Sequence, residues 1–242
     1  MNVWVLNAIL IEAMALAGII GVALTRRTKA AFAAGFNTML LVTVVYVATA
    51  PSLGARQVLV LVMVVVYLVH MNWLLFFQSQ HTAMAKLDAH SSLFEKYAMT
   101  FLLTNGVGWG YCLPFYFATR RNSPLNALDG IATFIYLIGT VIHWGSDYQK
   151  QRFKARPDSK GKLLTVGFWR WCRHPNYFGD FLIYVSFALI SGSLWGWVAP
   201  VLNFLQYRFD AIPKNERWAA EHYGAQWEMY RRRVKMFIPF IY

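Results

Sequence analysis

Charged side chains are scarce in this sequence, and their scarcity excludes most classes of soluble protein. Asp, Glu, Lys and Arg make up 14% of the 242 residues, whereas a soluble domain has roughly 25%. Hydrophobic residues reach 57%, aromatic residues reach 17%, and the mean hydropathy is +0.38. The composition therefore predicts an all-α integral membrane protein with a single membrane domain over residues 1–242.

Cysteines and the common ligand-binding motifs are also scarce. The two cysteines are Cys112, in an apolar segment, and Cys172, in a basic one, so we expect neither a disulfide nor a metal site. The sequence has no GxGxxG, GxxxxGKS/T, HExxH or CxxC pattern. A dinucleotide-binding fold of the soluble type is therefore not supported.

Acidic residues are few compared with basic ones. The chain has 11 Asp and Glu against 23 Lys and Arg, which gives a net charge of +12. In a soluble protein such an excess favours nucleic-acid binding. Here the basic residues lie at the ends of apolar segments, where membrane orientation and anionic lipid explain them. We therefore predict membrane lipids as partners and no nucleic acid.

Long apolar runs predict seven membrane segments, the last two as a short hairpin. The Lys and Arg residues, apart from Arg56, Arg120 and Arg121, fall on one side of this arrangement. The positive-inside rule places that side and the C-terminus in the cytoplasm. Compact loops favour a bacterial inner membrane, and the endoplasmic reticulum membrane is the alternative. The segments are residues 3–24, 31–50, 57–77, 97–118, 125–146, 181–192 and 194–207, with a polar helical tail at 208–236.

The densest group of mixed polar side chains lies in residues 161–180, GKLLTVGFWRWCRHPNYFGD. Arg173 is suited to phosphate or carboxylate, and His174 can hold or give a proton near neutral pH. Pro175 disfavours helix at His174 and allows a helix to begin after it. This position suits a ligand with a charged end and an apolar end. The alternative is a loop that faces lipid headgroups.

Two further groups of residues are candidates for phosphate or nucleotide contacts. Lys150 and Lys154 share a helical face if the fifth segment continues beyond residue 146, and with Arg173 they would suit a di- or triphosphate-type anion. The alternative is a solvated basic helix end. In the tail, Glu216, Tyr223, Trp227 and Tyr230 recur at helical spacing. This face either stacks on a nucleotide or packs under the membrane domain.

Polar residues inside the third segment are candidates for catalysis. Tyr67 and His70 are three residues apart and therefore lie on one helical face. Ionisable groups inside a membrane are costly, so they are functional candidates by default. Hydrogen bonding between helices is the alternative.

The run GFWRWCRHPNYFGD resembles the signature of membrane sterol reductases that act at the C-14, C-7 and C-24 positions. The ending ERWAAEHYGAQWEMYRRRVKMFIPFIY and the element QKQRFK are similar to theirs, and SDY and IPFIY are also similar to steroid 5α-reductases. The resemblance covers roughly residues 94–242. The RHPNYFG core is shared with isoprenylcysteine carboxyl methyltransferases.

The resemblance implies an enzyme that uses NADPH to reduce a carbon–carbon double bond of a steroid, sterol or isoprenoid-like lipid. Residues 1–96 would serve the lipid, and residues 97–242 would serve the cofactor. Asn176 would bond the carboxamide or a ribose hydroxyl, and Asp180 would accept from a ribose hydroxyl or orient Arg173. The implied cofactor residues are Asp147, Lys150, Lys154, Trp169, Arg173, His174, Asn176, Tyr177, Asp180, Glu216, Tyr223 and Tyr230.

The reaction also needs a protein acid to protonate the second carbon. Tyr67 and His70 are the first candidates, and Tyr177 and Asp180 are further ones. The first half departs from the 5α-reductases, because residues 31–50 lack their Gln-Glu pair. Two alternatives remain open: an S-adenosylmethionine-dependent methyltransferase and a non-catalytic lipid-binding protein.

Overall fold

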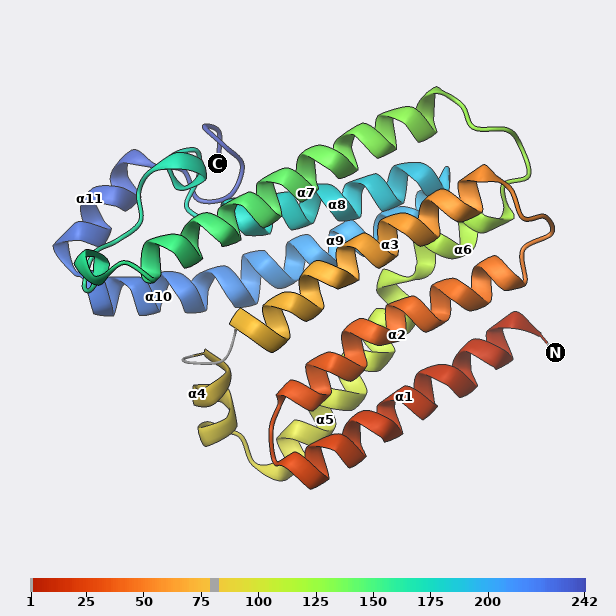
Figure 1. Cartoon of the computed structure of the whole chain (residues 1–242), viewed down its shortest axis with the longest axis horizontal. Helices are drawn as coiled ribbons and strands as arrows, with labels where there is room; N and C mark the ends of the chain where they lie inside the picture. The colour runs from red at the N-terminus through yellow and green to blue at the C-terminus, as the bar shows by residue number, and fades with distance from the viewer. Residues whose placement is uncertain (1, 79–82) are drawn as a thin grey trace. The chain divides into compact units, whose positions relative to one another are not determined.

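The computed structural model describes residues 2–78 and 83–242, and the regular secondary structure in this part of the chain is helical (Figure 1). Among these residues, four helices are long and apolar enough to cross a membrane: Val3–Thr25, Lys29–Ala48, Ala55–Phe77 and Ala127–Lys154. The prediction of an all-α integral membrane protein is confirmed. The count of seven segments stays a prediction.

The chain forms two compact units. The first contains the residues up to Gly130 together with Phe187–Ala199, and the second contains Ile131–Ser186 and Pro200–Tyr242. The first unit is built on α1 (Val3–Thr25), α2 (Lys29–Ala48), α3 (Ala55–Trp73), α4 (Ala83–His90), α5 (Leu93–Asn105) and α6 (Leu113–Arg120).

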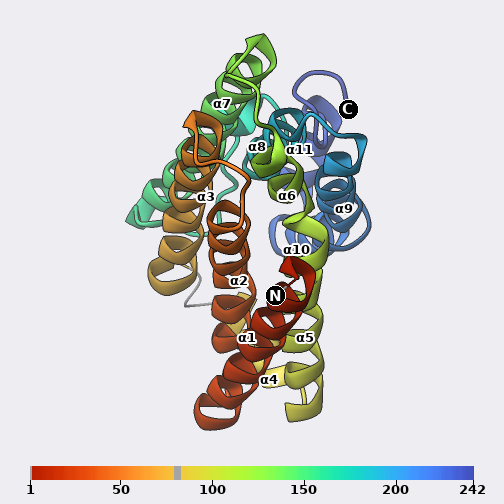
Figure 2. The same ribbon diagram turned by 90° about the vertical axis from the view of Figure 1, so that its right-hand side faces the viewer.

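In the first unit, α1, α2 and α5 lie side by side (Figures 1 and 2). Asn2 caps α1 by accepting the Trp4 N–H at 2.9 Å. Gly18 allows the close approach, because a Cβ there would lie 2.6 Å from side-chain atoms of Ala34 and Thr100. A buried ion pair between Arg56 and Asp129 joins the first turns of α3 and α7 (Ala127–Lys154).

The predicted segment 97–118 is an interrupted helix. A π-helical stretch, Gly106–Tyr111, separates α5 from α6. Three glycines weaken the ordinary helix here, and Pro114 sits in the first turn of α6, where a missing N–H costs little. The interruption therefore coincides with Gly106, Gly108 and Gly110.

The second unit contains most of α7, the start of α8 (Pro175–Ser191), and the chain from Pro200 onward. The helix α9 (Val198–Gln206) passes through a π-helical stretch, Tyr207–Ala211, directly into α10 (Ile212–Tyr223). The helix therefore continues through residue 207, where we expected the hairpin to end and the polar tail to begin. The end of the membrane segment stays a prediction. The unit ends with α11 (Ala225–Arg233).

Two glycines bring α7 and α8 close together in the second unit. A Cβ at Gly179 would lie 2.5 Å from the backbone nitrogen of His143 and 2.7 Å from the carbonyl oxygen of Gly139. Only glycine allows backbones to approach so closely. The crossing places the first turn of α8 beside the second half of α7, where the candidate polar residues lie.

Candidate functional site

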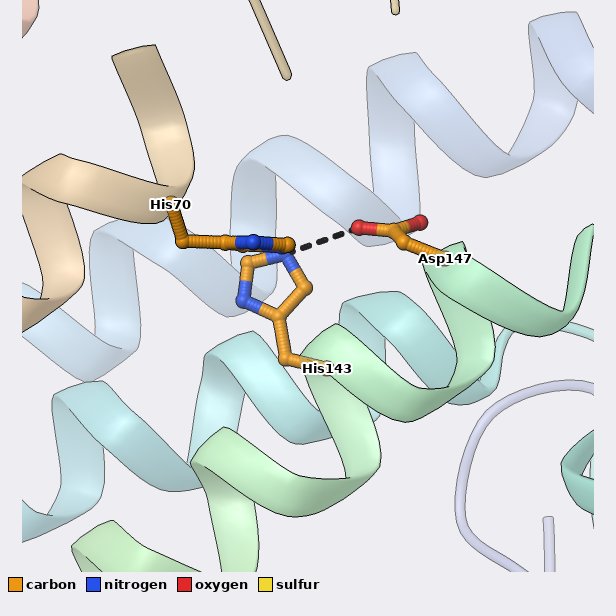
Figure 3. A group of neighbouring side chains, drawn as sticks. All are labelled: His70, His143 and Asp147. Atoms are coloured by element: carbon orange, nitrogen blue, oxygen red, sulfur yellow. Dashed lines mark ion pairs between the residues drawn. The ribbon is translucent and has the colours of Figure 1, made fainter. Parts of the chain in front are cut away.

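The last turns of α7 carry the first group of predicted site residues. The helix continues to Lys154, as the pairing of Lys150 with Lys154 requires. Asp147 is buried, and its carboxylate accepts from Asn176 Nδ2 at 3.2 Å. His143 Nε2 lies 3.5 Å from the other oxygen of Asp147, one turn away on the same helix (Figure 3). Asp147 and Asn176, both predicted site residues, are therefore in direct contact.

Lys150 and Trp169 form the second contact between predicted residues. The Lys150 ammonium lies over the indole ring, 5.0 Å from its centroid. Trp169 is held in place because its N–H donates to the Ser146 carbonyl at 3.2 Å and its own carbonyl accepts from Tyr230 Oη at 2.5 Å. Lys154 is exposed. The basic face of α7 thus has one cation on an aromatic platform and one in solvent.

Arg173 and His174 meet Glu216 of α10. Arg173 Nε donates to Glu216 Oε1 at 2.8 Å, and His174 Nε2 lies 3.3 Å from the same oxygen. Arg173 Nη1 also donates to the carbonyls of Val234 at 2.6 Å and Arg231 at 3.2 Å. The guanidinium is therefore largely occupied by groups of the protein itself.

Charge and burial shift the pKa values of the two acid–base groups beside Arg173, His174 and Glu216. Burial lowers the pKa of His174 below its ordinary value, although Glu216 acts in the opposite direction. Burial acts to raise the pKa of Glu216, but hydrogen bonds from His174 and Arg173 outweigh it and hold that pKa below its usual range. At neutral pH the group is a neutral imidazole, a carboxylate and a guanidinium.

The first two turns of α8 carry Tyr177 and Asp180. Tyr177 stacks between His174, at 5.5 Å, and Tyr207, at 4.3 Å, and its hydroxyl accepts from Asn215 at 2.7 Å. Asp180 is buried and accepts from Tyr207 Oη at 2.6 Å and from Asn203 Nδ2 at 2.8 Å. Within the described chain, Asp180 thus binds Asn203 of α9 and Tyr207 of the π-helical stretch after it, and Arg173 binds Glu216. Our alternative that Asp180 orients Arg173 is wrong.

The tail residues pack rather than form one continuous helical face. Gly224, with a φ of +49°, separates α10 from α11, so the spacing from Glu216 to Tyr230 crosses a break. Our prediction of one face is wrong because Gly224 ends the helix. Trp227, Tyr230 and Ala219 form a buried cluster against which Tyr223 packs. These aromatic side chains thus pack on one another, and a nucleotide contact or packing under the membrane domain stays a prediction.

Tyr67 and His70 lie on α3 in the first unit, and both are buried. Tyr67 contacts the Phe187 ring at 6.3 Å, and His70 stacks on Trp73 at 5.8 Å. Their catalytic role stays a prediction. Four polar residues in contact with the site were not among the predicted ones. They are His143, Asn203, Tyr207 and Asn215, and no motif or spacing distinguishes them in the sequence.

Comparison with known proteins finds several membrane sterol reductases among the relatives of this chain. The chain is 30% identical over 127 residues to Delta(14)-sterol reductase erg24 of Schizosaccharomyces pombe, a match of 45% of this chain and 29% of that protein. The Delta(14)-sterol reductase of Arabidopsis thaliana is 32% identical over 124 residues, covering 45% and 32%. Delta(14)-sterol reductase TM7SF2 of Mus musculus is 27% identical over 154 residues, covering 56% and 36%.

These matches confirm the resemblance to membrane sterol reductases, and the chain spans about a third of the length of these relatives. A family model described as a protein of unknown function, DUF1295, matches residues 19–234, which is most of the chain. This all-α integral membrane protein therefore belongs to the DUF1295 family.

Proposed function

We propose that this protein is an NADPH-dependent membrane reductase that reduces a carbon–carbon double bond of a sterol, steroid or isoprenoid-like lipid. The relatives named as Delta(14)-sterol reductases support the reaction class. The observation that supports NADPH as the cofactor is the basic face of α7, where Lys150 lies over Trp169 and Lys154 is exposed one turn later.

The donors present fit a phosphorylated dinucleotide. Lys150 and Lys154 offer two ammonium groups on one helical face, which suits adjacent phosphates. Asn176 and Asp147, bonded to each other, offer amide and carboxylate groups for hydroxyl or carboxamide contacts. Arg173 is held by Glu216, so we assign its main role to joining the site loop to α10.

NADPH, when bound, supplies the hydride. The protein would orient the nicotinamide and lipid, exclude water, and give a proton from Tyr67, His70 or Tyr177. Tyr177 can be tested directly in the second unit. Tyr177→Phe removes the hydroxyl bonded to Asn215 and keeps the ring stacked between His174 and Tyr207. If Tyr177 is the donor, this variant retains NADPH binding and loses turnover of a Δ14 sterol.

The cofactor proposal is tested by binding to the full chain in detergent. Lys150→Gln and Lys154→Gln should each weaken NADPH by about 1–3 kcal/mol, the value of a charged hydrogen bond, and should weaken NADH less. Lys160→Gln, an exposed loop residue, removes the same charge and serves as the control. Equal losses of affinity for NADPH and NADH would show that Lys150 and Lys154 do not contact the 2′-phosphate of NADPH. Binding of S-adenosylmethionine in place of either would favour the methyltransferase alternative.

A further inference from the structure

A groove of about 1160 Å³ lies in the second unit, along the last turns of α7 and the loop that follows them. It is lined by the aromatic residues Tyr148, Phe168 and Trp171 and by the basic residues Arg152, Arg156 and Arg170, among others. None of the lining residues is acidic. The groove therefore combines apolar surface with concentrated positive charge.

The groove lies on a different face of α7 from the candidate cofactor residues. Tyr148 and Arg152 are spaced four apart and share one face of α7, and Arg156 follows just beyond the end of the helix. Asp147, Lys150 and Lys154 follow a nearly opposite face of α7. The proposed reductase site does not use any of the three arginines. The groove is thus a separate feature of the unit.

The arginines are available to a ligand. All three are exposed; Arg152 lies over the Tyr148 ring at 5.6 Å, and Arg156 pairs with the equally exposed Asp158 at 3.2 Å. Such a surface pair is weak and exchanges readily for a stronger anion. Arginine binds phosphate oxygens with two parallel hydrogen bonds.

The surroundings indicate a lipid rather than a free anion. The α7 helix is apolar and long enough to cross a membrane, and the groove lies at its basic end. Tyr148 and Val166 expose 55% and 60% of their surface there. Aromatic and apolar groups beside arginines are typical of the membrane interface. We propose that this groove binds the headgroup of an anionic phospholipid, with the acyl chains along the exposed apolar side of α7.

The proposal is tested by native mass spectrometry of the full chain in detergent with short-chain phosphatidylglycerol, short-chain phosphatidylcholine and glycerol 3-phosphate. We expect phosphatidylglycerol to bind about tenfold more tightly than the other two. The triple variant R152Q/R156Q/R170Q should lose this preference. The matched control R231Q/R232Q/R233Q removes the same charge from exposed residues of α11 and should keep it.

Four results would overturn the proposal: equal binding of phosphatidylcholine, equally tight binding of glycerol 3-phosphate, an equal loss in the α11 control, or displacement of the lipid by NADPH. Equal binding of phosphatidylcholine would mean a non-selective surface, and equally tight glycerol 3-phosphate would mean a phosphate site. An equal loss in the α11 control would mean a general charge effect, and displacement by NADPH would mean a nucleotide site. If the triple variant does not fold, Arg152→Gln and Arg170→Gln are measured singly. Each must then weaken phosphatidylglycerol binding by about threefold or more, and a smaller effect in either variant rejects the groove.

Discussion

Arg173 Nε donates to Glu216 Oε1 at 2.8 Å, across 43 residues of sequence. The pair fastens the loop before α8 to α10, and His174 shares the same carboxylate oxygen. Arg173 and Glu216 side chains are 9% and 19% exposed, so solvent screens their attraction less than at an open surface. A residue expected to meet a ligand phosphate is thus also a link between distant segments.

Replacing Glu216 by Gln should destabilise the protein in the absence of any cofactor. The change leaves the Arg173 guanidinium mostly buried without its counter-charge, at a cost of roughly 1–3 kcal/mol. Thermal melting in detergent measures it. Glu221→Gln, an exposed position on α10, should melt like the natural protein. Equal melting of both variants would show that the pair does not stabilise this unit.

Acidification should weaken folding through His174. Its pKa is lowered in the folded protein, mainly by burial, so the unfolded chain takes up the proton first. Stability is therefore present above the unfolded pKa of about 6.5 and falls as pH drops toward the lower folded value. Glu216, whose folded pKa is also lowered, adds a loss below about pH 4.3.

The measurement compares melting temperatures at about pH 7.5 and about pH 5. The natural protein should lose more stability over this interval than His174→Gln, which has no proton to gain at this position. A variant with the same loss as the natural protein would mean that other groups account for the pH dependence.

Replacing Gly179 by Ala should separate α7 from α8. The added Cβ would meet the His143 backbone nitrogen at 2.5 Å, and backbone atoms cannot rotate away. We expect a destabilisation of roughly 1–3 kcal/mol. Gly130→Ala is the control, because a Cβ there meets nothing within 4 Å and α7 should gain about 0.5–1 kcal/mol. Similar melting of the two variants would contradict the close crossing.

Replacing Asp129 by Asn should strongly destabilise the first unit. Arg56 makes two hydrogen bonds to this carboxylate, at 2.8 and 2.7 Å, and both side chains are 2% exposed. Removing one partner of a buried ion pair costs roughly 3–5 kcal/mol. Asp158→Asn breaks an ion pair with Arg156 in which both side chains are 63% exposed, and it should change stability by about 0–1 kcal/mol. Melting curves of the two variants, measured side by side, decide whether burial of the ion pair causes the larger destabilisation.

The sequence by itself determined the class of protein and the local positions of its polar residues. Apolar runs of membrane length can satisfy their backbone groups only as helices or closed barrels, so their residue content was sufficient to predict α1, α2, α3 and α7. Pro175 ended the irregular loop and began α8. The spacing of Lys150 and Lys154 placed them on one face once the helix reached Lys154. All of these depend on residues within a few turns of one another.

Only the tertiary structure decided the partners of these residues. Asp180 binds Asn203 and Tyr207, 23 and 27 residues away, and Gly179 faces the backbone of α7. The left-handed turn at Gly224 also divided a tail whose spacing suggested one helix. Helical periodicity states which face a residue occupies, but not which other helix packs against that face. That choice depends on the fit of side chains from distant segments, which no local pattern contains.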